Sequence, residues 1–417
     1  MKIIRDAQLE APSYKEADVK NIVNLVKNKG DKAILRLTEK YDGVIVKKLE
    51  ITRDGIDQAY KSISPSTVSA IKKASKNITR FARAQMKQFK NFEIEIKKGV
   101  NVGQLIVPIE KIGIYIPGGN FPLPSSVLMA AIPAKVAGVK EIIMCSLPRY
   151  KGSINPVTLV AADICGINRI FKIGGAQAIA AMAYGTKTVP RVDKIIGPGN
   201  KYIIAAKKQV YGDVGIDFLA GPSEILIIAD KTANPKFIAS DLLAQAEHDI
   251  EAKAILVTNS ERLAYCVNKE VEKQITIVKT KKIAEQSLKK NGRIIIVKTI
   301  ENAIEFANRL APEHLELQIK EPKKYLSKLN NYGSLFLGSY SANVLEDYVT
   351  GTNHILPTGS SARFTAGLSV KDFIKLQTYQ YVNKKGFDKI LNTAIRMADI
   401  EGLDGHKKAL ELRKWSD

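Results

Sequence analysis

The residues KIGIYIPGGNFPLPSSVLM, at positions 111–129, contain the clearest indication of the fold class. The apolar run Ile112–Ile116 has the length of a buried strand, the turn Pro117-Gly118-Gly119 follows it, and helical periodicity runs through Ser126–Val136. A strand, a glycine turn and a helix in this order begin a βα unit, in which helices cover a parallel sheet. The stretch therefore predicts an α/β fold.

The same alternation continues in two successive series as far as residue 337. Further strands are expected at Glu141–Cys145, Ile170–Ile173 and Lys194–Ile196, then at Ile225–Ala229, Ala254–Thr258, Ile294–Val297 and Ser334–Leu337. Helices are expected near Pro156–Cys165, Ala176–Tyr184 and Tyr202–Tyr211, and from Phe237, Arg262, Ile300 and Pro322. Two series predict two doubly wound modules. The preceding Lys15–Lys98 region has helical periodicity and is interpreted as scaffold.

Length and composition restrict the class of protein. A chain of 417 residues is long enough for two or more domains. The 64 Lys and Arg against 42 Asp and Glu give a net charge of +22, but the lysines are spread along the chain and are not interleaved with aromatic residues. We therefore expect a solvated surface that attracts anionic ligands, and no nucleic-acid partner.

The cysteines and the apolar runs indicate where the protein works. Cys145, Cys165 and Cys266 are widely spaced in apolar stretches, which is typical of reduced cysteines in a cytoplasm. No run reaches the roughly 18–20 apolar residues of a membrane span. The N-terminus becomes acidic too early for a secretory signal. A cytoplasmic protein without a membrane partner is expected.

Four glycine turns are expected to follow strands and to outline a ligand cleft. They are Pro117-Gly118-Gly119, Gly174-Gly175-Ala176-Gln177, Gly197-Pro198-Gly199-Asn200 and Gly221-Pro222-Ser223. Ligands of open α/β sheets bind at the carboxyl ends of strands, where helix N-termini favour anions. The alternative is that these are tight turns only. No G-x-G-x-x-G fingerprint is present, so a dinucleotide does not follow from the motif alone.

Three segments contain polar residues suited to chemistry. In SDLLAQAEHD, at 240–249, Gln245 and His248 project from one side of a helix at a spacing that suits two ligands of one metal ion or a capped helix end. Glu313 and His314, on a turn bounded by proline, offer a general acid and base or a helix cap. The loop at 345–359 contains Asp347 and His354 and is interpreted as part of a site.

A last carboxylate and imidazole, Glu401 and His406, lie near the C-terminus and are weak evidence alone. Together Gln245, His248, Asp347 and His406 would offer nitrogen and oxygen ligands without a thiolate. Such a set suits zinc, with manganese or cobalt also possible.

At these residues the sequence resembles the histidinol dehydrogenase family over nearly its whole length. The resemblance runs through GIYIPGGNFPLPSSVLM, KIGGAQAIAAMAYGT, VDKIIGPGN, AGPSEILIIAD, DLLAQAEHD, APEHLEL, EDYVTGTNHILPTGSSARFTAGLSV and EGLDGHKKAL. One departure is Ile250, where family members generally have proline.

The resemblance implies two incomplete Rossmann-like domains in a homodimer that exchanges its C-terminal segments. The implied divisions are an N-terminal arm at 1–16, a zinc and substrate domain from 17–114 and 223–368, an NAD-binding domain at 115–222 and a dimerisation segment at 369–417.

The resemblance also implies a role for each site residue. Gln245, His248 and Asp347 would bind one zinc ion per subunit together with His406 of the other chain, and Tyr115, Gln177 and Asn200 would contact NAD. Glu313 would activate water and His314 would be the general base. Ser223 and Glu401, with the four metal ligands and His314, would contact the substrate.

The implied reaction is the four-electron oxidation of L-histidinol to L-histidine by two NAD molecules, through an aldehyde-level intermediate, in the last steps of histidine biosynthesis. One alternative is an NAD-dependent dehydrogenase for another amino alcohol or polyol. Another is a zinc hydrolase in which Glu313 activates a metal-bound water. A third is a basic nucleic-acid-binding protein.

Overall fold

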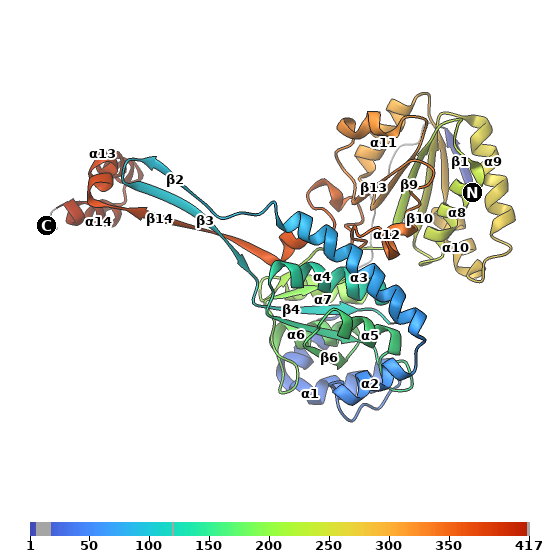
Figure 1. Cartoon of the computed structure of the whole chain (residues 1–417), viewed down its shortest axis with the longest axis horizontal. Helices are drawn as coiled ribbons and strands as arrows, with labels where there is room; N and C mark the ends of the chain where they lie inside the picture. The colour runs from blue at the N-terminus through green and yellow to red at the C-terminus, as the bar shows by residue number, and fades with distance from the viewer. Residues whose placement is uncertain (6–17, 119–120, 415–417) are drawn as a thin grey trace.

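The computed structural model describes residues 1–5, 18–118 and 121–414, which form two parallel sheets covered by helices and a third, antiparallel sheet that projects away from them (Figure 1). Parallel sheets with helices on their faces confirm the predicted α/β fold class. None of the helices among these residues is long and apolar enough to cross a membrane.

The five-stranded sheet has the order β6-β5-β4-β7-β8. Its strands are β4 (Lys111–Ile116), β5 (Glu141–Ser146), β6 (Arg169–Lys172), β7 (Lys194–Ile196) and β8 (Gly215–Ile216). The helices between them are α4 (Pro124–Ala137), α5 (Pro156–Ile164), α6 (Gly175–Tyr184) and α7 (Lys201–Val210). Ile112, Ile114 and Ile116 are fully buried, as expected of a parallel sheet that is covered on both faces.

The six-stranded sheet has the order β1-β11-β10-β9-β12-β13. Its strands are β1 (Lys2–Arg5), β9 (Glu224–Ala229), β10 (Lys253–Thr258), β11 (Arg293–Ile296), β12 (His314–Gln318) and β13 (Ser334–Leu337). The helices of this module are α8 (Pro235–Ala246), α9 (Glu261–Gln274), α10 (Lys281–Asn291), α11 (Ile300–Leu310) and α12 (Val344–Tyr348). The helix expected from Pro322 is a 3-10 helix, Pro322–Lys328.

The N-terminal helices pack on the five-stranded module, which differs from the predicted division of the chain. They are α1 (Lys20–Asp42), α2 (Arg53–Lys61) and α3 (Pro65–Met86), and they contact α6, α5 and α4 respectively. Each helix has one apolar face, and helices that already cover a sheet offer the apolar surface to bury it. Residues 20–86 therefore pack mainly with 111–216, although α3 also contacts the later segment, where Asn77 Nδ2 donates to Val349 O at 2.7 Å. The described part of the predicted N-terminal arm, β1, pairs with β11.

The antiparallel sheet joins two segments that are far apart in sequence. It consists of β2 (Phe92–Lys97), β3 (Val100–Pro108) and β14 (Ile374–Val382), and it leads to α13 (Lys384–Glu401) and α14 (Asp404–Lys414). We call these five elements the arm. The helical interpretation of Lys15–Lys98 is wrong at β2, because every side chain of that strand is exposed and no alternation of buried residues marks it.

Candidate active site

Glu313 and His314 lie at the start of β12, so the expected turn is wrong from His314 onward. Both are buried, with 5% and 8% of their surface exposed. β12 is placed beside β9, where His314 is in register with Ile225. Three of the five residues of this strand, His314, Glu316 and Gln318, are polar or charged although all are buried.

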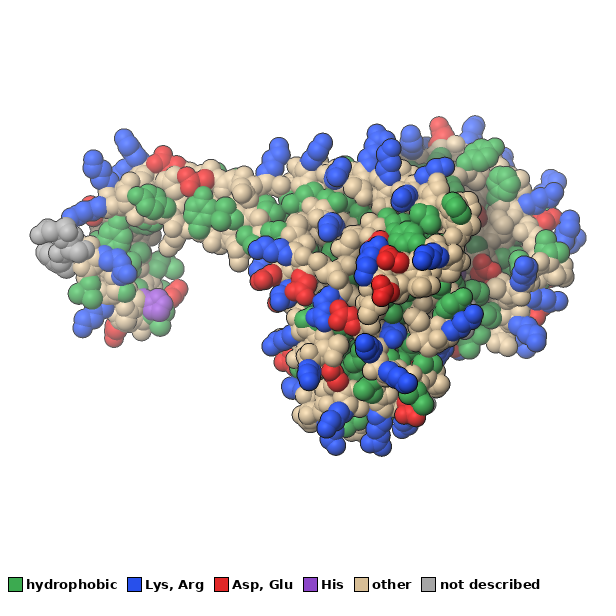
Figure 2. All heavy atoms as spheres, turned by 60° about the horizontal axis from the view of Figure 1, so that its bottom comes forward, with side chains coloured by type: hydrophobic (Ala, Val, Ile, Leu, Met, Phe, Trp, Pro, Cys, Tyr) green, Lys and Arg blue, Asp and Glu red, His purple; other side chains and the backbone are tan. Residues whose placement is uncertain are grey.

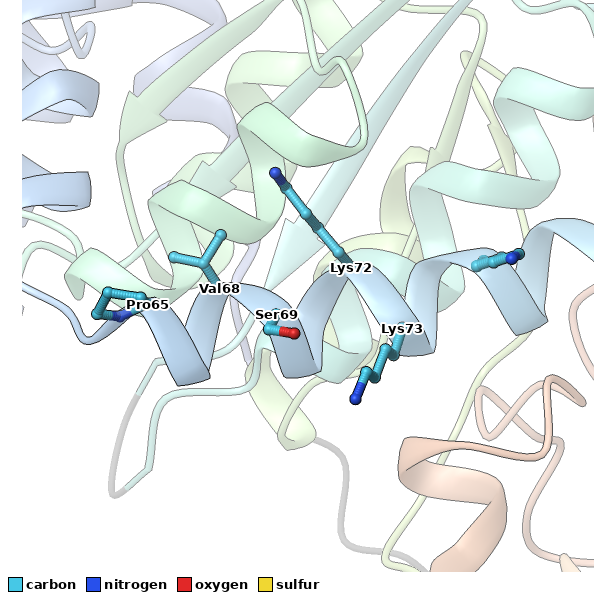
Figure 3. A pocket seen from close by; sticks show the side chains of 6 residues that line it. Pro65, Val68, Ser69, Lys72 and Lys73 are labelled. Carbon is cyan, nitrogen blue, oxygen red and sulfur yellow. The ribbon is translucent and has the colours of Figure 1, made fainter.

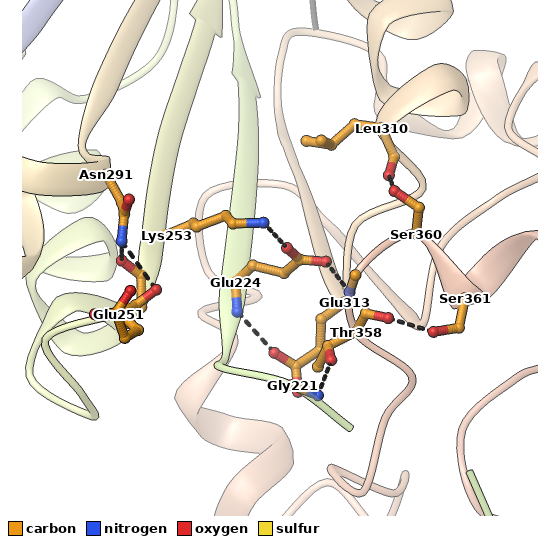
Figure 4. A network of polar contacts seen from close by, with 12 residues as sticks. Gly221, Glu224, Glu251, Lys253, Asn291, Leu310, Glu313, Thr358, Ser360 and Ser361 are labelled. Atoms are coloured by element: carbon orange, nitrogen blue, oxygen red, sulfur yellow. Dashed lines mark hydrogen bonds and ion pairs between the residues drawn. The ribbon is translucent and has the colours of Figure 1, made fainter. Parts of the chain in front are cut away.

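The backbone of Glu224, at the start of β9, holds both candidate catalytic side chains. Its amide donates a hydrogen bond of 2.8 Å to Glu313 Oε2 (Figure 4), and its carbonyl oxygen lies 3.1 Å from His314 Nδ1. With Nδ1–H donating to that carbonyl, a neutral His314 imidazole presents Nε2 as the proton acceptor. The geometry therefore leaves one ring nitrogen free for general-base chemistry.

The side chain of Glu224 connects the same point to a neighbouring loop. One oxygen accepts from the Gly359 amide at 3.0 Å and the other lies 3.2 Å from Lys253 Nζ (Figure 4). Burial raises the pKa of Glu224, while the Lys253 charge opposes the shift. The Thr358 hydroxyl accepts from the Gly221 amide, which ties the loop to the segment before β9. Sequence reasoning missed Glu224; an acidic residue opening an apolar strand was the only available signal.

Opposing effects act on the His314 imidazole. Burial lowers its pKa, but the Glu313 carboxylate, Glu346 and the Glu224 carbonyl together raise that pKa to about 9. The distance from His314 Nδ1 to Glu313 Oε2 is 3.4 Å. The imidazole of His314 can therefore hold a proton while Glu313 is ionised, and its pKa falls when the negative charge of Glu313 is neutralised.

Three of the four predicted metal ligands come from the ends of α8 and α12. Gln245 is buried in α8, and its Oε1 accepts from Asn343 Nδ2 at 3.4 Å, just before α12. Gln245 Nε2 and Asn343 Oδ1 have no hydrogen-bond partner among the residues that the structure describes. Reversing both amides keeps one hydrogen bond and turns the Gln245 oxygen to the unpartnered side, so this residue fits a ligand role.

Asp347 and His248 complete the set that one chain brings together. Asp347 Oδ1 lies 2.9 Å from His354 Nδ1. Burial would raise the pKa of Asp347, but the hydrogen bond and charge of His354, with His314 and His248, lower it. His248 is exposed just beyond α8. An ionised carboxylate, an imidazole and an amide oxygen are a donor set that suits zinc.

Glu401 and His406 are not brought to this site within the chain. Both are exposed on the arm, Glu401 at the end of α13 and His406 in α14, well away from α8 and α12 (Figure 1). Among the described residues, no three His, Cys, Asp or Glu side chains gather as metal ligands. A single chain therefore offers an incomplete ligand set.

The predicted nucleotide contacts gather at the carboxyl edge of the five-stranded sheet. Tyr115 Oη accepts from the Gly175 amide at 3.3 Å, and a Cβ at Gly175 would lie 2.6 Å from Gln177 Oε1. A Cβ at Gly197 would lie 2.1 Å from Tyr115 O, so this position accepts only glycine. Asn200 caps α7 by accepting from two of its amides. The N-termini of α6 and α7 provide amide donors for an anion at this edge.

The fourth glycine turn is at the other module. Gly221-Pro222-Ser223 precedes β9, so the interpretation that it follows a strand is wrong, and Ser223 lies at the amino edge beside Glu224. Gly119 lies outside the described residues.

The loop at 345–359 joins the two modules. Ser126 Oγ, at the start of α4, is hydrogen-bonded to His354 Nε2 of this loop at 3.2 Å, and Asn353 Nδ2 donates to Met129 O at 2.8 Å. The site therefore lies at the junction of the modules.

Basic side chains are distributed over the visible face of the molecule and do not form one patch (Figure 2). A hollow of about 430 Å³ on α3 contains three of them (Figure 3); it is lined by Pro65, Val68, Ser69, Lys72, Lys73 and Lys76. None of the predicted site residues lines this hollow.

The three cysteines are unpaired, and Cys145 and Cys165 are buried.

A glycine-lined edge of one α/β module, joined to a second module that holds a buried imidazole and carboxylate, is typical of an α/β enzyme. Comparisons with known proteins identify its family. The family model of histidinol dehydrogenase matches residues 5–414. The histidinol dehydrogenase of Clostridium acetobutylicum is 44% identical over 427 residues, with 99% of each chain covered. That of Methanocaldococcus jannaschii is 46% identical over 395 residues, covering 95% of this chain and 91% of the relative.

The crystal structure of histidinol dehydrogenase from Elizabethkingia anophelis has a TM-score of 0.94 to this chain at 42% identity, covering 99% of this chain and 98% of that one. The chain belongs to the histidinol dehydrogenase family. Membership confirms the resemblance, and with it the predicted dehydrogenase activity in histidine biosynthesis.

Proposed function

We propose that the chain oxidises L-histidinol to L-histidine in two successive hydride transfers to NAD, with one zinc ion per subunit and an aldehyde-level intermediate retained between the steps. The observation that carries the proposal is the junction itself. There the Glu224 backbone holds Glu313 and His314, the Glu224 side chain accepts from Gly359 in the loop that follows Asp347, and His354 of that loop is hydrogen-bonded to Ser126 at the start of α4.

Each proton step has a residue of suitable chemistry. His314 takes the hydroxyl proton of histidinol as the first hydride leaves its carbinol carbon for NAD. Glu313 accepts a proton from water as it adds to the aldehyde, and protonated His314 returns its proton to the aldehyde oxygen, so that the hydrate forms and His314 is again a base. His314 then takes a hydroxyl proton of the hydrate as the second hydride leaves. The balance is one water consumed and two NADH formed per histidine.

Gln245, His248 and Asp347 would hold zinc from one chain, with His406 of the second chain as the fourth ligand. Zinc when bound would anchor the substrate amine and imidazole without changing its own oxidation state. Ser223 and Glu401 would contact the substrate, while Tyr115, Gln177 and Asn200 would contact NAD at the glycine turns.

The arm supports a homodimer in which the C-terminal segments are exchanged. It exposes large apolar side chains on its strands and helices, among them Ile96 at 63%, Tyr381 at 65%, Ile400 at 65% and Leu412 at 66%. Figure 2 shows such side chains along the arm. An exposed apolar surface of this kind marks an interface, and a second copy would both cover it and receive His406.

The test is an assay of purified protein with zinc, NAD and histidinol in the presence of a known amount of substrate. Two NADH formed for each histidinol consumed support the proposal. Turnover of another amino alcohol or a polyol, with none of histidinol, would change the substrate. A reaction independent of NAD would indicate a zinc hydrolase.

The unpaired cysteines suit the reducing cytoplasm in which we place this reaction.

A further inference from the structure

A buried ion pair, Lys207 of α7 with Asp217 after β8, has no part in the reaction described above. Their side chains are 3% and 1% exposed. Charged side chains are seldom buried so completely. Removing a charged group from water costs roughly several kcal/mol for each ion, unless hydrogen bonds replace the lost hydration. The position of those hydrogen bonds shows what the pair can hold.

The pair binds both peptide groups of Gly197. Lys207 Nζ donates to Gly197 O at 3.0 Å and to Phe218 O at 3.1 Å, and it also contacts Asp217 Oδ1. The other Asp217 oxygen accepts from the Gly197 amide at 2.8 Å. All three donors of the ammonium group are therefore used, and two of the polar groups involved belong to one glycine.

Gly197 has no side chain of its own to fix its position. Its φ of +123° and its close approach to Tyr115 O exclude a Cβ. Asn200, three residues further on, is the N-cap of α7 and a proposed NAD contact. The same ion pair also holds the Phe218 carbonyl, in the segment that leads to Ser223 and into the other module. One buried pair thus connects the nucleotide turn to the link between the modules.

We propose that Lys207 and Asp217 are positioning residues of the dinucleotide site, which hold the turn Gly197–Asn200 against Tyr115. The proposal rests on the proposed NAD-binding role of that turn. It differs from a purely stabilising role, because the bonds are made to the turn itself and would affect NAD more than histidinol.

The experiment compares two double variants of the full-length enzyme. Lys207→Met with Asp217→Leu removes both charges and every bond to Gly197. Lys207→Met with Asp217→Asn also removes both charges but keeps an acceptor for the Gly197 amide. Removing both charges avoids leaving one buried ion without its partner. The control is Arg169→Met with Glu50→Leu, which removes the 2.7 Å bidentate pair at the amino end of β6, the edge opposite the glycine turns.

We expect the leucine variant to raise KM for NAD by about 10- to 100-fold, with KM for histidinol little changed. This is the range of effects found when residues that hydrogen-bond to metal ligands are mutated, which also act by orienting another group. The asparagine variant should show a smaller rise and the control none. Amide hydrogen exchange in peptides spanning residues 195–204 should quicken in the leucine variant before NAD is added, and not in the control.

Exchange that quickens equally throughout the module, or an unchanged turn with an unchanged KM for NAD, would overturn the positioning role. So would failure of both double variants to fold, since the pair would then serve stability. If the wild-type enzyme does not use NAD, the proposed function fails by the kinetic measurement, while the exchange measurement still decides whether the pair anchors the turn.

Discussion

His314 is the residue on which the proposed chemistry depends most directly. Its Nδ1 is occupied by the Glu224 carbonyl, and its own carboxylate neighbour, Glu313, is held by the Glu224 amide. The imidazole is thus oriented by main-chain groups, whose positions depend on the pairing of β9 with β12. A base held in this way needs no adjustment of its own ring before it accepts a proton.

Replacing His314 by alanine should lower kcat by about 10²–10⁴-fold, the usual contribution of a general base. Bound zinc should stay at the wild-type level, because the predicted ligands are Gln245, His248, Asp347 and His406. Stopped-flow measurement of NADH formation and metal analysis of the same sample provide the test. Loss of the metal with the activity would instead make His314 a ligand.

Sequence reasoning found this residue pair but not its setting. The proline before Glu313 and His314 predicts a turn, yet His314 is the first residue of a buried strand. Glu224 was overlooked, since its role is performed largely by backbone atoms that no side-chain pattern reports.

At the scale of elements, α8 and β12 meet through two buried carboxyl groups. Gln318 Nε2 donates to Asp241 Oδ2 at 3.1 Å and to Glu316 Oε1 at 2.9 Å. Burial is the main cause that raises the pKa of Asp241, to about 6, and burial with the Asp241 charge raises that of Glu316. His314 is the positive group that acts on Glu316 in the opposite direction. This contact sets α8, which carries Gln245, against the strand of His314.

The raised pKa values predict that stability falls as the pH rises. Between the unfolded pKa of an ordinary carboxyl group and about 6, the folded chain holds more protons than the unfolded chain, so the free energy of unfolding decreases with increasing pH. Glu316→Gln supplies a permanently neutral group. We expect the free energy of unfolding of the Glu316→Gln protein to exceed that of the wild type by about 1–3 kcal/mol at pH 8, because the wild type bears the usual cost of a buried polar group without a partner. The difference should be smaller at pH 5.

Urea unfolding at both pH values measures this difference. The exposed Glu305→Gln, on α11 of the same module, is the matched control and should change stability little at either pH. A Glu316→Gln protein that is less stable at pH 8 than the wild type would mean that the carboxyl pair is ionised and compensated in the fold.

At the scale of the whole molecule, the arm separates residues that the proposed site requires together. His406 is in α14 on the arm, while His248 follows α8 and Asp347 is in α12, two helices of the six-stranded module (Figure 1). Exchange of arms between two copies would reunite them, and it would cover the apolar side chains of the arm.

His406→Ala and His248→Ala should each lose zinc and activity when pure. Mixed in equal amounts under conditions that allow subunit exchange, they should recover about a quarter of wild-type activity, because half the dimers are mixed and each has one intact site of two. A mixture of Gln245→Ala with His248→Ala is the control; it should recover none, since each site then lacks one ligand. Exchange without recovery in the first mixture would show that the ligands do not come from two chains.

The α/β class and most strands of the two parallel sheets can be predicted from the sequence, because buried parallel strands are continuous apolar runs bounded by glycine turns. The sequence also marked Gln245, His248, Glu313, His314 and Asp347 as chemically suited, through local residue types and spacing. Three features are visible only in the folded chain: α1 to α3 cover the five-stranded sheet, β2 and β3 join β14 in the arm, and Glu224 and Lys207 are hydrogen-bonded to groups far away in sequence or in neighbouring turns. These features depend on contacts between segments far apart in the chain, and neither periodicity nor spacing encodes which apolar face or main-chain group another segment will meet.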